Sequence, residues 1–222
     1  MNKRIVCSMI FNFIIFVTVL IGTLFMVTGF KFMSSAGNLT STGWAAFKYF
    51  TVDSNIIVGL VAFIMFIYEL LYLSKRIEVI PQFVYILKHI GTVGVILTFV
   101  VTLFYLAPLL GSKFLFLYQN TNLLFHLIVP IFSFVSFVFF EKTKIDFKYT
   151  FYGLSTMLLY GIYYIGNIIV HLDNGVVNSK YDWYGFMKLG LLSIFIVVPI
   201  MMVITYLISW VLYKLNKLKL NI

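Results

Sequence analysis

Hydroxyl, amide and imidazole side chains recur at helical spacing in several apolar stretches of this sequence. Thr51 and Asn55 are four residues apart, and so are Asn122 and His126. Residues four apart lie on one face of a helix. A hydroxyl becomes an effective nucleophile when a base lies within hydrogen-bond reach, and imidazole titrates near neutral pH. The pattern therefore predicts acyl-transfer chemistry, with Thr51 as the nucleophile and His126 as the base.

Further polar residues in these stretches are candidates for substrate binding or support. Asp53 lies beside Thr51, and either Asn55 or Asn122 is placed to help bind an oxyanion. Four residues follow one helix face at i, i+4, i+7 and i+11, namely Tyr160, Tyr164, Asn167 and His171, and a weaker stripe contains Thr98, Thr102 and Tyr105. Polar stripes in lipid face the bundle interior or a wet cavity. We therefore expect them to surround one outward-opening pocket.

The central residues also have structural interpretations. Thr51 is placed to cap the first turn of a helix, with Asp53 against the positive end of the helix dipole. An interhelical hydrogen bond would satisfy His126. His171 is explained either as an interfacial histidine or as a ligand for a polar headgroup, and His89 is expected at the cytoplasmic surface.

Membrane-spanning helices must position these residues, because the composition excludes a water-soluble fold. Hydrophobic residues make up 62% of the 222 positions and charged residues 10%, against about 45–50% and about 25% in soluble domains. A spanning helix takes about 20 mostly apolar residues. Such stretches lie at residues 5–30, 47–73, 83–110, 117–140, 147–170 and 186–213. The sequence predicts an all-α membrane protein whose single domain, residues 1–222, is a six-transmembrane-helix bundle.

The positive charges predict the orientation. Eleven of the 16 Lys and Arg residues fall on one side of the expected spans: Lys3, Arg4, Lys75, Arg76, Lys88, Lys142, Lys144, Lys148, Lys214, Lys217 and Lys219. The remaining five are Lys31, Lys48, Lys113, Lys180 and Lys188. Cytoplasmic loops are the ones enriched in Lys and Arg. Both termini are therefore expected in the cytoplasm, with the chain in the cell membrane and the polar stripes toward the outer side.

No cofactor, metal or nucleic-acid partner is expected. Cys7 is the one cysteine, and the three histidines fall on different expected helices. The sequence has no P-loop, dinucleotide fingerprint, G-x-S-x-G elbow or H-E-x-x-H helix. The basic residues are dispersed between apolar runs, which suits topology and anionic lipid headgroups better than nucleic acid. The expected partners are membrane lipids and a lipid-like ester substrate, and the oligomeric state stays open.

A family resemblance rests on a few of these residues. The stretch Phe47-Lys48-Tyr49-Phe50-Thr51 enters one span, and Asn122-x-x-x-His126-x-x-x-Pro130 lies in a later one. This pattern resembles the family of androgen-induced and androgen-dependent tissue-factor-pathway-inhibitor-regulating membrane proteins and their six-pass bacterial relatives. The resemblance implies a hydrolase of fatty acid esters of hydroxy fatty acids, with Thr51 and His126 as its catalytic residues. Trp183-Tyr184-Gly185-Phe186 is similar to a W-x-P-F stretch of that family, with glycine in place of the usual proline.

Two other functions compete with an intramembrane lipid ester hydrolase. A small-solute or proton-coupled transporter would use Asp53 and His126 as titrating groups. The sequence shows no inverted repeat, and no strongly acidic group is expected at mid-depth, where a relay would need one. The remaining alternative is a protein that binds lipids without catalysis.

Overall fold

The chain folds into a bundle of long helices, as the sequence predicts. The structure is a computed structural model and describes residues 3–33, 42–141 and 145–218. Six helical segments in this part are long and apolar enough to cross a membrane: Lys3–Thr28, Phe50–Leu73, Gln82–Tyr118, Thr121–Phe140, Phe147–Val170 and Gly190–Lys217. The number and order of the spans are confirmed. Lys142, Lys144 and Lys219, used above for orientation, lie outside the described residues, and so does Asn38, which begins the short glycosylation pattern Asn38-Leu39-Thr40 in the expected outer loop after the first span.

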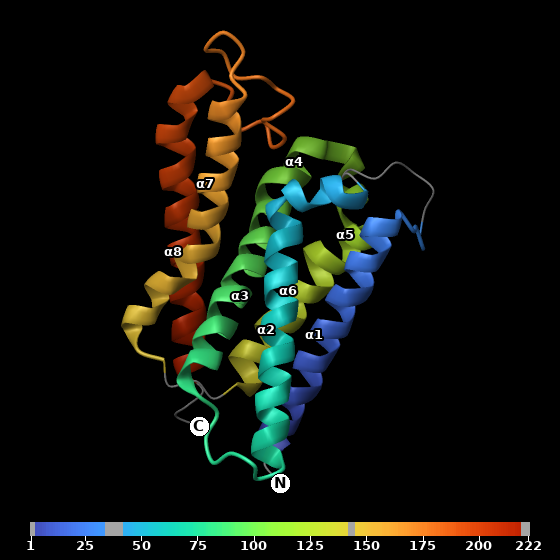
Figure 1. The fold of residues 1–222 in the computed structure, drawn as a ribbon, viewed down its shortest axis with the longest axis vertical. Helices are drawn as coiled ribbons and strands as arrows, with labels where there is room; N and C mark the ends of the chain where they lie inside the picture. The colour runs from blue at the N-terminus through green and yellow to red at the C-terminus, as the bar shows by residue number, and fades with distance from the viewer. Residues whose placement is uncertain (1–2, 34–41, 142–144, 219–222) are drawn as a thin grey trace.

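Three spans are continuous α-helices for most of their length. These are α1 (Lys3–Thr28), α2 (Phe50–Leu73) and α8 (Ile194–Leu218), the last preceded by the short 3-10 helix η7 (Gly190–Ser193). A 3-10 helix, η1 (Gly43–Lys48), leads into α2. The start of α1 and the end of α8 lie at the same end of the bundle (Figure 1), which we name the terminal end, and the opposite end is the loop end.

The other three spans change helical type along their length. The third comprises α3 (Gln82–Val101), the π-helix η2 (Thr102–Leu106), α4 (Ala107–Leu110) and the 3-10 helix η3 (Gly111–Tyr118). The fourth comprises α5 (Thr121–Leu123), η4 (Leu124–Ile128), α6 (Val129–Val135) and η5 (Ser136–Phe140), with η4 and η5 π-helical. The fifth joins the 3-10 helix η6 (Phe147–Leu154) to α7 (Ser155–Val170).

Two π-helical segments end just before a proline. Pro108 follows η2 and Pro130 follows η4 at the same spacing. Proline has no N–H to donate to the carbonyl four residues earlier, and the residue before each proline instead bonds five residues back, as Val129 does to Leu124. π-helical turns are frequent at functional sites. One of them contains His126.

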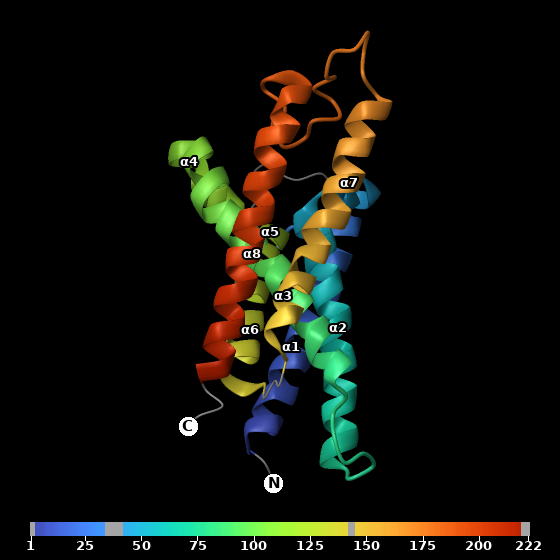
Figure 2. The same cartoon turned by 90° about the vertical axis from the view of Figure 1, so that its left-hand side faces the viewer.

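The third span lies in the middle of the bundle. Helix α3 packs against α2, α6, α7 and α8, and Figure 2 shows it crossing the view diagonally, so that α4 leans away from α7. Helices α1 and α2 approach closely at Gly59, where a Cβ atom would lie 2.6 Å from Val19. Small residues permit such contacts between membrane helices.

The outer surface of the bundle is apolar. Leu60 of α2 is 57% exposed, Phe104 72%, Leu159 of α7 67% and Phe195 of α8 78%. Soluble monomers do not expose apolar side chains so continuously. A surrounding hydrocarbon phase explains this apolar surface.

Candidate functional site

Thr51 lies in the first turn of α2 without capping it. The N-cap residue is Tyr49, which makes no side-chain capping bond. The Tyr184 hydroxyl, from the loop before α8, instead accepts a hydrogen bond of 2.9 Å from the Phe50 N–H. The predicted capping role of Thr51 is therefore wrong, because the helix begins one residue before it. The Thr51 hydroxyl therefore does not cap the helix.

The Thr51 side chain borders a small cavity of about 40 Å³. The polar residues around this Thr51 cavity come from four spans or loops and are Thr51, Thr98, Thr102, Tyr160 and Tyr184. Apolar side chains complete it: Phe50, Val101, Leu106, Met157, Phe186 and Met201. Polar residues of the second, third and fifth spans converge here, whereas Asn122 and His126 of the fourth span, which were expected at the same pocket, do not border this cavity.

His126 is buried, with 2% of its surface exposed. Its Nδ1 lies 2.8 Å from the carbonyl oxygen of Leu117. A carbonyl can only accept, so Nδ1 carries the ring hydrogen and Nε2 is left with its lone pair. The imidazole is therefore held in the tautomer that a general base requires.

Asn55 joins the segments that carry Thr51 and His126. Its Nδ2 donates to the Thr51 carbonyl at 2.7 Å and to the Phe125 carbonyl at 3.1 Å. Phe125 immediately precedes His126, so one amide ties the first turn of α2 to the π-helical turn η4. In the described part of the chain, no hydrogen bond joins the Thr51 side chain to His126 itself.

The two remaining polar candidates of these segments lie near the same end of the bundle. Asp53 is partly exposed in the first turn of α2, where a negative charge is favourable. Asn122 is 7% exposed and lies one turn before His126. Between the third and fourth spans, Asn120 accepts hydrogen bonds from the Phe32 and Met33 N–H groups at 2.9 and 2.8 Å, which fixes the start of the fourth span against the chain that follows α1.

The polar stripe of the fifth span divides into two parts. Tyr160 borders the Thr51 cavity and donates to the Lys48 carbonyl at 2.7 Å, and Tyr164 donates to Asp182. Asn167 and His171 lie further toward the loop end. The His171 ring bonds to the Asn167 carbonyl at 2.8 Å and stacks on Tyr181 with 3.8 Å between ring centroids. The structure thus brings Tyr160 to the Thr51 cavity and Tyr164 to the loop before α8, and leaves Asn167 and His171 at the loop end.

The loop before α8 covers the Thr51 cavity, which the sequence alone did not indicate. Asp182 accepts from the Phe186 and Met187 N–H groups at 3.0 Å each, and Trp183 donates to the Tyr160 hydroxyl at 3.0 Å. Burial raises the pKa of the Tyr184 phenol, so this residue keeps its proton. The signal that could have identified the loop was its aromatic stretch, Trp183–Phe186.

Gly185 adopts a backbone conformation that a proline could not. Its φ is +66°, a conformation that proline, fixed near −65°, cannot adopt. The loop conformation that places Tyr184 over Thr51 therefore requires the glycine found in this sequence.

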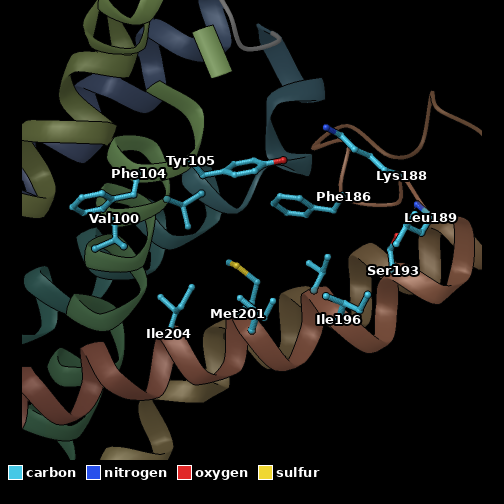
Figure 3. Close-up of a pocket in the computed structure, with 14 residues that line it drawn as sticks. Val100, Phe104, Tyr105, Phe186, Lys188, Leu189, Ser193, Ile196, Met201 and Ile204 are labelled. Atoms are coloured by element: carbon cyan, nitrogen blue, oxygen red, sulfur yellow. Dashed lines mark hydrogen bonds between the residues drawn. The ribbon is translucent and has the colours of Figure 1, made fainter. Parts of the chain in front are cut away.

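A larger crevice opens beside the Thr51 cavity, between the third and sixth spans. It has a volume of about 630 Å³ and is lined almost entirely by apolar side chains, with Tyr105, Lys188 and Ser193 as its polar members. Figure 3 shows Met201, Ile196 and Ile204 of α8 facing Val100 and Phe104 across this space. Val101, Phe186 and Met201 border both the crevice and the Thr51 cavity. The two spaces are therefore adjacent and share these three side chains in their walls.

His89 is not at the surface, contrary to the prediction. It is fully buried, and its Nε2 lies 2.7 Å from the Ser209 hydroxyl of α8. Lys88, assigned to the cytoplasmic face, is fully buried as well. Because α3 is surrounded by other helices, polar residues near its end face protein instead of water. Glu69, 1% exposed, likewise shows that the second span carries a buried acidic group.

The residues described contain no group of three or more His, Cys, Asp or Glu side chains that could hold a metal ion. Comparison with known proteins gives no family model, no curated protein and no solved structure that matches this chain.

Proposed function

We propose that this chain is an intramembrane hydrolase of lipid esters, with Thr51 as nucleophile and His126 as base. The observation that carries the proposal is that Thr51 borders a small cavity which shares Val101, Phe186 and Met201 with the wall of an apolar crevice of about 630 Å³. A fatty acyl chain suits such a crevice, because its walls are apolar. A hydroxyl in the adjacent cavity suits attack on an acyl carbonyl.

The reaction would proceed in two steps. The Thr51 hydroxyl attacks the acyl carbonyl while His126 Nε2 takes its proton, directly or through one water. The ester C–O bond breaks, the leaving alkoxide receives that proton, and an acyl-threonine remains. Water, deprotonated by His126, then attacks the acyl-threonine, which releases the acid and returns the proton to Thr51.

The developing oxyanion would lie near the N-terminus of α2. Backbone N–H groups in the first turn of a helix have no acceptor within the helix. The Phe50 N–H is bonded to Tyr184, and those of Val52 and Asp53 to the Tyr49 carbonyl. The Thr51 N–H forms no such bond with the other described residues. We propose this N–H as the oxyanion donor, with Asn122 in a supporting role.

Supporting roles follow for the other candidates. Tyr160 and Tyr164 hold the loop that covers the cavity, through the bonds described above. Asp53 favours the start of α2. Asn167 and His171 would act at the loop end, on a substrate headgroup. The proposed location is the cell membrane, with the terminal end in the cytoplasm and Thr51 toward the outer leaflet, as the Lys and Arg distribution favours.

The test is covalent labelling of the purified protein by a fluorophosphonate probe. Labelling is expected in the unmodified chain and lost in Thr51→Ala and in His126→Ala. Thr28→Ala is the matched control, because Thr28 is an exposed hydroxyl at the end of α1 that bonds its own helix. Retained labelling in both site variants would refute the assignment, and bound lipid without turnover would indicate a lipid-binding protein.

Proton-coupled transport is the second candidate, and one observation favours it. Lys88, Glu69 and Glu141 are buried in the bundle, and ionisable residues inside membrane spans often belong to ion pathways. Solute flux in proteoliposomes that persists in Thr51→Ala and stops in Glu69→Gln would favour transport over hydrolysis.

A further inference from the structure

A second polar cluster lies at the terminal end of the bundle, far from Thr51. Its members are Asn12 of α1, Glu69 of α2, Lys88 of α3 and Glu141, which follows η5. Each is at most 1% exposed. Glu69 lies near the end of α2 opposite to Thr51, about 27 Å along the helix at ~1.5 Å per residue. The cluster is therefore separate from the proposed hydrolase site.

Lys88 and Asn12 connect the two carboxylates. Lys88 Nζ lies 3.4 Å from Glu141 Oε1 and donates to Asn12 Oδ1. Asn12 Nδ2 lies 3.2 Å from Glu69 Oε2 and 3.4 Å from Glu141 Oε1. The Ser136 hydroxyl donates to the same Glu141 oxygen at 2.8 Å. Glu141 thus has an ammonium partner, whereas Glu69 is bonded by neutral groups, the Asn12 amide and the Ser8 hydroxyl.

Among the described residues, the cluster leaves one carboxylate oxygen without a hydrogen-bond donor. Asn12 Nδ2 carries two hydrogens but faces three acceptors, since Ser8 Oγ lies 3.3 Å away in addition to the two carboxylates. Glu141 Oε2 is buried and has no hydrogen-bond partner among the described residues. A buried acceptor without a donor costs about 1–3 kcal/mol. One additional hydrogen in the cluster would remove this deficit.

The charge balance of the cluster also indicates one additional proton. In the described part of the chain, Lys88 is the cation that forms an ion pair with these carboxylates. Arg4 forms no ion pair with the described carboxylates: its Nε donates to the Phe140 carbonyl at 3.2 Å, and its buried Nη2 has no hydrogen-bond partner among the described residues. His89 bonds Ser209. The other polar groups that face the cluster from neighbouring helices are neutral side chains: Ser8, Tyr72, Tyr85, Ser136 and Asn216. Two ionised carboxylates against one ammonium would leave one negative charge in a site without water contact.

We propose that Glu69 and Glu141 together form a buried binding site for one proton. An uncompensated charge in a protein interior costs several kcal/mol, so the neutral form is strongly favoured. With one proton bound, the site has one carboxylate, one ammonium and one neutral carboxyl group, which can donate a hydrogen bond. The proton belongs to the pair of carboxyls, since coupled groups titrate together. This inference stands whether or not Thr51 is catalytic.

The bound proton has a structural consequence. Asn12, Glu69, Lys88 and Glu141 come from four different spans or span ends, so the cluster joins them in one place. Loss of the proton would leave two carboxylates competing for one ammonium and one amide. The site is therefore a proton-dependent link between the first four spans.

Infrared spectroscopy of the purified protein with ¹³C-labelled glutamate side chains tests this directly. The chain has three glutamates, Glu69, Glu78 and Glu141, and Glu78 is exposed in a loop. The isotope-shifted band of protonated carboxyls counts how many glutamates hold a proton, with the acid-treated protein as the reference for all three. At neutral pH the expected count is one.

Substitutions test whether the number of protonated glutamates follows the charge balance of the cluster. Glu69→Gln and Glu141→Gln should each reduce it to zero, because one carboxylate then matches Lys88. Lys88→Met should raise it to two. Glu78→Gln is the matched control and should leave it at one. A count of zero in the unmodified chain and in Glu78→Gln would overturn the proposal, and this comparison leaves the cluster intact, so it decides the question even if the buried variants do not fold.

Discussion

The Nδ2 atom of Asn55 lies 3.1 Å from the carbonyl oxygen of Phe125, which fixes the second span to the fourth at the residue before His126. The same atom holds the Thr51 carbonyl at 2.7 Å. A single amide therefore determines how the helix turn that carries the hydroxyl sits against the turn that carries the imidazole.

Asn55→Ala is expected to reduce both stability and probe labelling. The lost interhelical bond corresponds to about 1 kcal/mol in membrane proteins, and the two segments would no longer be held in register. Thermal unfolding in detergent and fluorophosphonate labelling measure the two effects. Ser54→Ala is the comparison, because Ser54 joins α2 to Thr98 of α3 at 2.9 Å and makes no bond to the fourth span. Equal labelling in both variants would contradict the role of Asn55.

The apolar crevice predicts that the KM for ester substrates depends on the length of their acyl chain. Ile200→Trp would fill the space beside the Thr51 cavity, because Ile200 lines the crevice. We expect KM to rise about tenfold for long-chain esters, a loss of ~1.4 kcal/mol of binding, with little change for a short soluble ester. Val203→Trp is the control: Val203 is 58% exposed on the same helix and does not line the crevice. A similar change in KM for both esters would show that the crevice does not bind the chain.

The loop before α8 predicts two further effects on stability. Tyr184→Phe removes the acceptor for the Phe50 N–H and should cost about 1 kcal/mol. Gly185→Pro should cost more, because φ is +66° at this position and proline is confined near −65°. Thermal unfolding measures both. Gly166→Ala is the control, since its Cβ would meet no neighbouring atom. Tolerance of Gly185→Pro would show that the loop adopts another conformation.

The spans could be predicted from sequence because each is a local property of the chain. Roughly 20 consecutive apolar residues leave helix as the only way to satisfy the backbone in hydrocarbon. The spacing of Thr51 and Asn55, or of Tyr160 and Tyr164, likewise follows from helical geometry. Because polar faces in lipid turn toward one another, the same spacing predicts that the stripes of the second, third, fourth and fifth spans surround one pocket. The structure brings residues of the second, third and fifth spans to the Thr51 cavity, and leaves Asn122 and His126 outside its lining.

The buried charges could not be predicted in the same way. Lys88 and His89 stand near the end of a span, where a long polar side chain ordinarily reaches the interface. Their burial depends on α3 being enclosed by α2, α6, α7 and α8, which is a property of helix packing and not of the local sequence. The position of the loop before α8 could not be predicted for the same reason. Its residues Trp183 and Tyr184 bond to Tyr160 and Phe50, which belong to other spans.

The proposed orientation can be tested by labelling cysteines introduced at each end of the bundle, after the single natural cysteine is replaced. In a Cys7→Ser background, a new cysteine at Val79 would lie in the loop between α2 and α3, at the terminal end, where the side chain is 74% exposed. Val176, 67% exposed in the loop after α7, gives the matching position at the loop end. Because Lys and Arg are concentrated toward the terminal end, a membrane-impermeant maleimide should label Val176→Cys in intact cells. It should label Val79→Cys only after permeabilisation. The reverse pattern would place the Thr51 cavity on the cytoplasmic side, and would make a lipid of the inner leaflet the substrate to test.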